Sequence, residues 1–220
     1  MIRFEDVSKQ YRKGDAVVDA LAGVSFDVEQ GELALVRGPS GSGKTTLVNL
    51  AAGLSHPTRG SITIAGTCLD RLSLQERAAL RAKDVAVVFQ LFHLVPYLST
   101  LENVLLPTLA SPNKDGALDR ARVLISELGL ESRSSHYPDE MSAGERQRCA
   151  LARALLNSPS VILADEPTGN LDPASAETVL KHLDEARKRG ASVLLVSHQP
   201  VENIHPDRVF ELREGKLAVV

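Results

Sequence analysis

The 220 residues suffice for one large domain, or for a core with a small inserted subdomain, but not for such a domain together with a membrane domain of several spans. Apolar residues make up 43% and charged residues 24% of the chain, which excludes an intrinsically disordered protein. The net charge of −3 and the 4% of aromatic residues argue against a protein whose main task is to bind nucleic acid phosphates or to stack single-stranded bases.

The first third of the chain predicts short β-strands. We expect strands at Ala20–Val28, Glu32–Val36 and Ser61–Ile64, and turns at Gly14, Gly23, Gly31 and Gly60. A glycine-rich segment follows the second of these strands, and the apolar stretch Thr46–Leu54 after it is typical of a helix. No signal peptide is expected, because the N-terminal MIRFEDVSKQ has no apolar core.

The middle third is mostly helical in character. Ser73–Glu76 and Ser99–Glu102 match the capping box that opens many helices. Apolar residues recur at helical spacing in Ala117–Leu130. One strand is expected here, at Val85–Phe89. We therefore predict that residues 91–140 form a helical subdomain inserted between residues 1–90 and 141–220.

The last third alternates between helices and strands. Helices are expected at Glu145–Asn157 and Pro173–Arg189, and strands at Val161–Ala164, Ser192–Val196 and Arg208–Leu212. Strands separated by helices predict an α/β core with a parallel sheet.

The cysteines and the apolar runs bear on the compartment. Cys68 and Cys149 lie far apart and form no C-x-x-C pair, so neither a disulfide framework nor a zinc site is expected. The longest apolar runs are strand-sized, whereas a membrane-spanning helix needs about 20 residues. We expect a cytoplasmic protein whose membrane role, if it has one, comes through a partner.

A phosphate-binding loop is predicted where the strand Glu32–Val36 ends. The sequence GPSGSGKT fits G-x-x-x-x-G-K-[ST] and lies between a strand and a helix, as the motif requires. Its backbone N–H groups and the helix dipole would hold phosphates, Lys44 would reach the β- and γ-phosphates, and Thr45 would ligate Mg²⁺. The alternative is a glycine-rich turn that matches by chance, and the motif leaves adenine or guanine open. The predicted phosphate-contacting residues are Gly38, Pro39, Ser40, Gly41, Ser42, Gly43, Lys44, Thr45 and Thr46.

Two acids end the strand Val161–Ala164. Because strand alternation sends Asp165 and Glu166 in different directions, they can take different roles. We predict that Asp165 holds Mg²⁺ through water and that Glu166 polarises the attacking water. Taken alone, the pair would more often be a solvated strand end, and it is the phosphate-binding loop upstream that favours the functional interpretation.

With these motifs the chain resembles the ATP-binding subunits of ABC transporters over essentially its whole length. The resemblance includes Gln90 in the place of the Q-loop, Met141–Glu145 in the place of the Leu-Ser-Gly-Gly-Glu signature, Gly169–Asp172 as the D-loop, and His198 as the H-loop. It implies a P-loop NTPase core of mixed sheet, with parallel core strands, an antiparallel β-subdomain and an inserted α-helical subdomain. It also implies ATP and Mg²⁺ as cofactors, with Gln90 and His198 among the catalytic residues and Gln90 also near the metal.

The signature residues have two interpretations. Ser142, Ala143, Gly144 and Glu145 form a capping box, so the simpler interpretation is a helix start. In the family the same helix end contacts the γ-phosphate bound by the other subunit, so that two ATPs hold a dimer together. Ala143 replaces a glycine, which costs little if its φ is negative.

Four further residues have both a structural and a functional interpretation. Asp172 precedes Pro173 and predicts a helix cap, to which the resemblance adds contact across the dimer. Tyr11 lies where the family stacks an aromatic ring on adenine, although it could simply be a surface residue. Gln90 could be only a polar residue at the end of a strand, and His198 could be a structural histidine.

The resemblance also implies partners. The sequence of residues 89–104 and the sequence ADEPTGNLD are most similar to the lipoprotein-releasing and macrolide-efflux subgroup. These sequences are equally compatible with the cell-division member of that subgroup. We expect a homodimer, or a pair of ATP-binding subunits, on integral membrane permease subunits at the cytoplasmic face of the inner or plasma membrane, with no nucleic acid bound. Phe92, Leu94 and Leu98 are the docking candidates. A soluble ABC ATPase of DNA repair or translation is the other class considered, and a P-loop kinase explains neither the signature nor His198.

Overall fold

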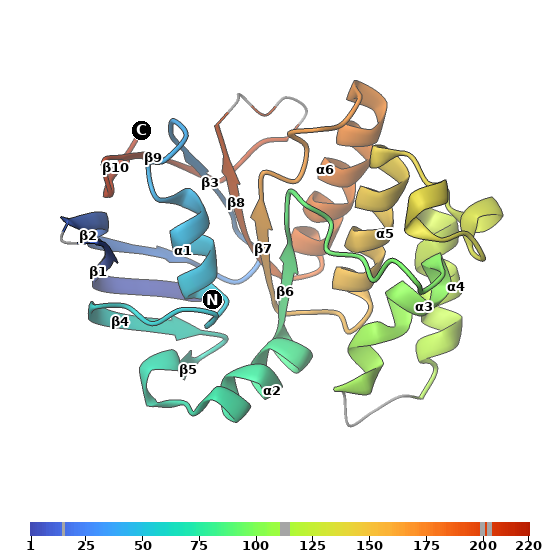
Figure 1. Ribbon diagram of the computed structural model, residues 1–220, viewed down its shortest axis with the longest axis horizontal. Coiled ribbons are helices and arrows are strands. Elements are labelled where there is room, and N and C mark those ends of the chain that lie inside the picture. The colour runs from blue at the N-terminus through green and yellow to red at the C-terminus, as the bar shows by residue number, and fades with distance from the viewer. Residues whose placement is uncertain (15, 111–114, 199–200, 202–203) are drawn as a thin grey trace.

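The computed structural model describes the chain except for residues 15, 111–114, 199–200 and 202–203, and it shows an α/β fold with two sheets (Figure 1). An antiparallel sheet has the order β2-β1-β4-β5, with strands β1 (Ile2–Lys13), β2 (Ala16–Val28), β4 (Arg59–Ile64) and β5 (Thr67–Cys68). The second sheet has the order β10-β9-β3-β8-β7-β6. Its strands are β3 (Leu33–Arg37), β6 (Val85–Val88), β7 (Val161–Asp165), β8 (Ser192–Ser197), β9 (Arg208–Arg213) and β10 (Lys216–Val219). All of its pairings are parallel except β9–β10. This arrangement confirms the predicted fold class.

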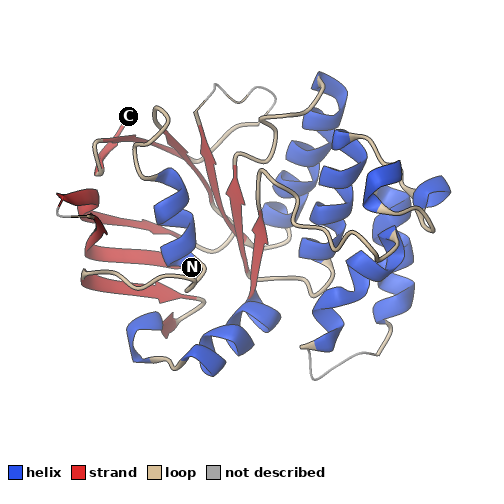
Figure 2. Cartoon of the chain, viewed as in Figure 1, coloured by secondary structure: helices blue, strands red, loops and turns tan. Residues whose placement is uncertain are grey.

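The helices cover both faces of the second sheet (Figure 2). They are α1 (Lys44–Ala51), α2 (Leu74–Asp84), α3 (Thr100–Leu105), α4 (Ala117–Glu127), α5 (Ala143–Leu155) and α6 (Pro173–Lys188). Short 3₁₀ helices lie at Leu69–Arg71, Leu106–Leu109, Glu131–Arg133 and Pro138–Glu140. In the part of the chain that the structure describes, no helix combines the length and hydropathy that crossing a bilayer requires.

The core divides at the second sheet, because side chains of a strand alternate between its faces. In β3, Leu33 and Leu35 join a cluster with α3, α4, α5 and α6. Ala34 and Val36 join a second cluster with α1 and the antiparallel sheet. Helices α1 and α5 therefore pack on opposite faces of the same sheet.

The predicted inserted region packs closely on the core. Helices α3 and α4 lie against α5 (Figure 1), and Val104, Ala121 and Leu124 belong to the same apolar cluster as Leu35 of β3. Residues 111–114 of the predicted subdomain lie outside the described residues.

Two predicted turns are wrong. Gly23 and Gly60 lie inside β2 and β4, with φ of 65° and 85°, and both face an irregularity of β1 at Asp6. Asp6 has φ 50°, and the register of β1 shifts around it in the pairing with β2 and in the pairing with β4. A Cβ on Gly60 would lie 2.4 Å from the Asp6 carbonyl oxygen, so this bulge requires glycine there.

Candidate functional site

The glycine-rich loop joins β3 to α1 and leaves the first turn of that helix open. Gly43 caps α1 with φ 108°, no side chain accepts from the helix N–H groups, and no acid lies in the first turn. A Cβ on Gly43 would lie 2.3 Å from the Ala20 carbonyl oxygen, and one on Gly38 would lie 2.2 Å from that of Leu212. The loop thus depends on glycine to pass between β2 and β9, and it presents unpaired N–H groups at a positive helix end.

Lys44 lies folded over this loop. Its ammonium donates to the carbonyl oxygens of Gly38, at 2.7 Å, and Pro39, at 2.9 Å, and lies 3.8 Å from Oε1 of Glu166. The side chain is only 5% exposed, so a buried cation sits between the loop and the end of β7. An anion bound in the loop would meet this charge directly.

Asp165 ends β7 and accepts a hydrogen bond from the Thr45 side chain. Burial raises the pKa of Asp165, and the charge of Glu166 adds to this, while the Thr45 hydrogen bond and Lys44 oppose it. Hydroxyl and carboxylate oxygens thus lie side by side at the start of α1. Such oxygens are the ligands that Mg²⁺ prefers.

Glu166 is held in an unusual conformation. Its φ is 48°, in the left-handed region, while its backbone N–H donates to the Val196 carbonyl oxygen at 3.0 Å. His198 Nδ1 lies 2.5 Å from Oε2 of this carboxylate, which is 14% exposed. Because Oε2 accepts from the imidazole, Oε1 is left to face Lys44.

Gln90 completes the group at this edge of the sheet. A Cβ on Gly169 would lie 3.4 Å from Gln90 Nε2 and 3.7 Å from Oε2 of Glu166, so all three residues adjoin. Gln90 follows β6, Glu166 follows β7 and His198 follows β8. In a parallel sheet the carboxyl ends share one edge, and ligands bind there.

The predicted signature residues lie elsewhere in the chain. Ser142 caps α5 and accepts from the Glu145 N–H, while the Glu145 side chain accepts from the Ser142 N–H at 2.7 Å. Hydrogen bonds from Arg133 and from this N–H hold the pKa of Glu145 at about 2. Ala143 lies in the helix and is not among the residues with positive φ, so its Cβ is accommodated. Since α5 and α1 pack on opposite faces of the sheet, this helix end does not join the chain's own glycine-rich loop.

The start of α5 abuts the start of α6. Asp172 caps α6 by accepting from the Ser175 N–H at 3.0 Å, as predicted for a structural cap. A Cβ on Gly144 would lie 2.3 Å from Ser175 Oγ. Arg148 donates to the same hydroxyl at 3.0 Å. Glycine at residue 144 therefore sets how closely the two helix ends approach.

Tyr11 lies on β1, paired with Val18 of β2, and 43% of the residue is exposed. Val18 is two residues from Ala20, whose carbonyl oxygen faces Gly43 of the loop. The Lys9 ammonium lies 5.1 Å from the centre of the ring. An exposed aromatic face thus stands on the antiparallel sheet near the loop.

Sequence reasoning missed Arg153 of α5. Its guanidinium donates to the carbonyl oxygens of Phe92, at 2.8 Å, and His93, at 2.6 Å. Both residues have positive φ, 32° and 49°, in the segment that follows Gln90. Arg153 thus ties that strained segment to α5. No local pattern signals such a contact, because the partners are 60 residues apart in sequence.

The predicted docking residues are partly buried. Phe92 and Leu98 are half-buried, and Leu94 packs partly against the core. Leu91 and Tyr97, which the sequence did not single out, are 70% and 78% exposed.

Comparison with known proteins identifies relatives over the full length. A family model described as "ABC transporter" matches residues 21–169. The Uncharacterized ABC transporter ATP-binding protein MJ1508 of Methanocaldococcus jannaschii is 39% identical over 221 residues, covering 100% of this chain and 99% of that protein. Two solved structures of MJ0796 superpose with a TM-score of 0.91 at 33% and 34% identity, covering 99% of this chain and 96% of theirs. One is described as a dimeric post-hydrolysis state bound to ADP and Pi, the other as a dimeric bacterial ABC transporter cassette.

Proposed function

The chain belongs to the ABC transporter family of ATP-binding proteins and is an ATPase, and from that premise we propose that it works in pairs to drive an integral membrane permease. The observation that supports the proposed roles in hydrolysis is the meeting of Lys44, Glu166 and His198 at the carboxyl edge of the sheet.

The proposed hydrolytic roles follow from this geometry. The loop and Lys44 hold the β- and γ-phosphates. His198 donates to Oε2 of Glu166, so Oε1 is the oxygen that remains to take a proton from the attacking water. Gln90, beside the same carboxylate, orients the water by a neutral amide. The water oxygen forms a bond to the γ-phosphorus as the bond to the bridging oxygen breaks, and the product ADP leaves with that oxygen.

The residues present fit a magnesium ion. Among the described residues no group of three or more His, Cys, Asp or Glu side chains could hold a metal alone. The Thr45 hydroxyl and the Asp165 carboxylate supply oxygens beside the loop and would hold the ion together with phosphate oxygens and water. Bound there, the ion would neutralise charge on the phosphates, and its own charge would favour the ionised form of Asp165.

The proposed pair of chains follows from the two faces of the sheet. Because α5 and α1 lie on opposite faces, Ser142–Glu145 would reach a γ-phosphate only in a second copy. The dimers described for MJ0796 support a pair of chains. We infer that Asp172 contacts the partner beside this site and that Tyr11 stacks on adenine.

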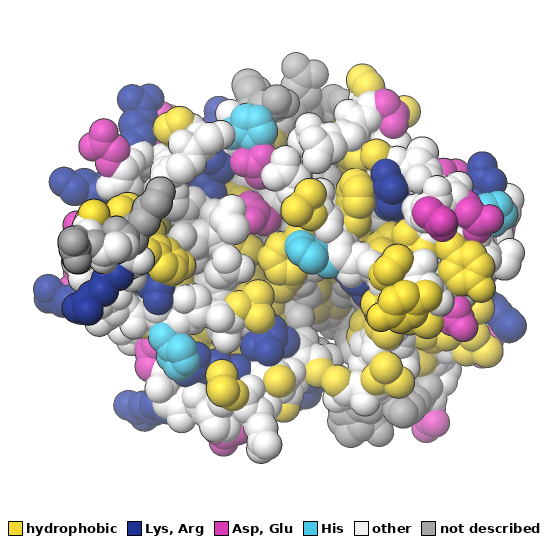
Figure 3. All heavy atoms as spheres, viewed as in Figure 1, with side chains coloured by type: hydrophobic (Ala, Val, Ile, Leu, Met, Phe, Trp, Pro, Cys, Tyr) yellow, Lys and Arg dark blue, Asp and Glu magenta, His cyan; other side chains and the backbone are white. Residues whose placement is uncertain are grey.

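The proposed permease contact lies on residues 91–98. Leu91 and Tyr97 expose apolar surface there, beside the half-buried Phe92 and Leu98. Figure 3 shows apolar side chains gathered on the helical side of the molecule. We infer a helical subdomain at 91–140, docking at the cytoplasmic face of the inner or plasma membrane. Lipoprotein release or macrolide or peptide efflux is the proposed work, with a membrane-coupled cell-division role as the alternative.

Replacement of Glu166 by Gln tests the hydrolytic role. We expect ATP to bind as before, turnover to fall by about 10²- to 10⁴-fold, and an ATP-bound dimer to accumulate. The exposed Glu177 of α6, changed to Gln, is the matched control and should keep full turnover. Wild-type turnover in Glu166→Gln would contradict the assignment. Ser142→Arg should lose hydrolysis yet keep the nucleotide affinity of a single chain.

The permease contact has its own test. Tyr97→Asp should leave the ATPase activity of the isolated protein intact and prevent co-purification of an integral membrane protein from detergent extract. If the wild-type chain retains no such protein, the permease proposal fails while the ATPase assignment stands.

A further inference from the structure

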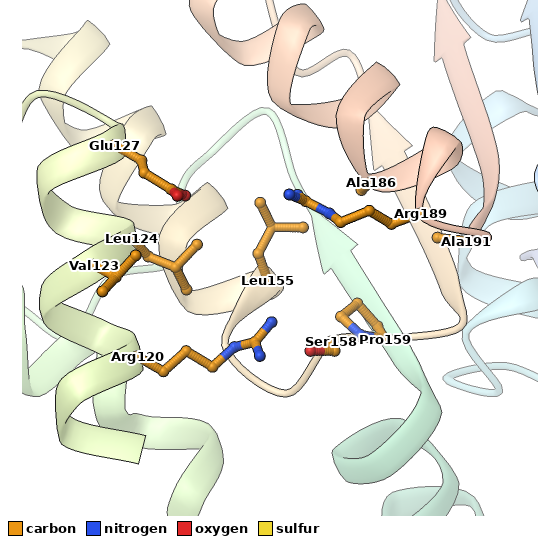
Figure 4. A pocket seen from close by; sticks show the side chains of 10 residues that line it. All are labelled: Arg120, Val123, Leu124, Glu127, Leu155, Ser158, Pro159, Ala186, Arg189 and Ala191. Carbon is orange, nitrogen blue, oxygen red and sulfur yellow. The ribbon is translucent and has the colours of Figure 1, made fainter. Parts of the chain in front are cut away.

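A hollow of about 410 Å³ lies between α4, the turn after α5, and the end of α6 (Figure 4). Its floor is apolar and formed by buried residues, among them Leu124, Leu155 and Ala186. The volume falls within the roughly 300–1,000 Å³ typical of pockets for small ligands. Three segments far apart in sequence therefore enclose a space large enough for a small molecule.

Two arginines enter the hollow from opposite walls. Figure 4 shows Arg120 of α4 and Arg189, which follows α6, with their guanidinium groups directed over Leu155. In the part of the chain that the structure describes, no carboxylate lies within ion-pair distance of either group, whereas their neighbours Arg122 and Arg187 pair with Asp119 and Asp184.

One acid, Glu127 of α4, also lies at the rim, so cationic groups outnumber anionic ones there. Ser158 adds a hydroxyl on the side of Arg120. An apolar floor beneath paired cationic walls is complementary to an anion that carries an apolar tail.

The hollow is separate from the ATPase site. Pro159 and Ala191 line it, and these residues precede β7 and β8. The groups of the ATPase site lie at the other ends of the same strands, where Asp165 ends β7 and His198 follows β8. A ligand in the hollow would therefore not overlap ATP.

We propose that this hollow binds a small carboxylate with a short apolar tail, the carboxylate lying between Arg120 and Arg189 and the tail on Leu124 and Leu155. Because the walls come from α4 on one side and from α6 and the α5–β7 turn on the other, the bound molecule fastens the predicted helical subdomain to the core. This proposal does not depend on the membrane partner.

Calorimetric titration with octanoate tests the proposal on the full chain. We expect saturable binding at one site per chain, unaffected by saturating ATP, and a rise in melting temperature. Octanol and octylammonium, with the same tail, should bind at least tenfold more weakly or not at all. Arg120→Gln and Arg189→Gln should each weaken octanoate binding about threefold, and together about tenfold, because both residues are exposed and water screens their charge.

Arg122→Gln is the matched control, since Arg122 lies on the same helix and pairs with Asp119 outside the hollow. It should leave the affinity unchanged. The proposal is overturned if octanoate does not bind, if octanol binds equally well, if the double variant binds as wild type while melting normally, or if ATP displaces the ligand.

Discussion

Helices α1 and α5 begin in opposite ways, although both beginnings were predicted as anion sites. The first turn of α1 has a left-handed glycine as its cap, no side-chain acceptor and no acid. The first turn of α5 has the Ser142 hydroxyl as its acceptor and carries its own anion in Glu145. Both helices have a positive dipole end, but only α5 satisfies one of its first N–H groups with a side chain and places a carboxylate beside that end.

The difference teaches that one helix end cannot be understood without its neighbours. At α1 the chain keeps the site open through glycines that pass close to Ala20 and Leu212. At α5 the Glu145 carboxylate is held by Arg133 at 2.7 Å, so the net charge near that end is balanced within the chain. In the proposed pair, the γ-phosphate that a second copy brings to α5 would therefore lie beside Glu145.

The largest expected effect is at the open end. Gly43 has φ 108°, and in Gly43→Ala the new Cβ would lie 2.3 Å from the Ala20 carbonyl oxygen. We therefore expect the free energy of unfolding to fall by about 3 kcal/mol or more and ATP binding to be lost. Gly41→Ala is the control, with φ 80° and open space around it, and should cost about 1 kcal/mol. Urea unfolding and ATP titration measure both. Equal costs would contradict the close-approach argument.

The next effect concerns the contact between α5 and α6. Gly144→Ala would place a Cβ 2.3 Å from Ser175 Oγ, and we expect a loss of about 2 kcal/mol from overpacking. Ser175→Ala in the same chain removes the nearest atom and should restore part of the loss, as a double-mutant cycle by urea unfolding would show. Ala143→Gly, one residue earlier, should cost only about 1 kcal/mol. Absence of coupling would mean that the helix ends are not in contact.

A smaller effect is expected for the cap of α5. Ser142→Ala removes the acceptor for the Glu145 N–H and should lower the free energy of unfolding by about 1 kcal/mol. Ser99→Ala at the start of α3 removes the same capping box from another helix and should cost a similar amount. A much larger loss at residue 142 would show that the hydroxyl does more than cap the helix.

The smallest effect depends on pH. Glu145 has a pKa of about 2 in the folded chain and near 4.5 otherwise, so its contribution is full above pH 4.5 and is lost as pH falls towards 2. Arg133→Gln should raise that pKa. The variant should be less stable at pH 7 by under about 1 kcal/mol, because the pair is partly exposed, and the difference should shrink at pH 3. A difference independent of pH would contradict this cause.

Local patterns accounted for most of what the sequence predicted correctly. The capping boxes at Ser73, Ser99 and Ser142 are all present, since a serine and a glutamate three residues later satisfy each other without help from elsewhere. The glycine-rich loop likewise lies between a strand and a helix, although that helix begins at Lys44 and ends at Ala51, earlier than the predicted Thr46–Leu54.

Non-local pairing explains what was missed. In β1 the buried residues Ile2 and Phe4 alternate, but the bulge at Asp6 shifts the pattern to Val7, so the strand was not predicted. The glycines opposite the bulge, on two other strands, were mistaken for turns. The role of Arg153 was missed for the same reason. Its acceptors are carbonyl oxygens of the segment following Gln90, which are far away in sequence and are brought to Arg153 only by folding.

The left-handed backbone at Glu166 has a consequence for selection. A residue with a side chain costs about 1 kcal/mol there, whereas glycine adopts φ 48° freely. A chain selected only for stability would therefore drift towards glycine at this residue and would lose the carboxylate that we propose for hydrolysis. If Glu166 has the proposed role, folding and catalysis favour different amino acids at this residue, and a stability screen of this protein would flag the proposed catalytic carboxylate as a defect.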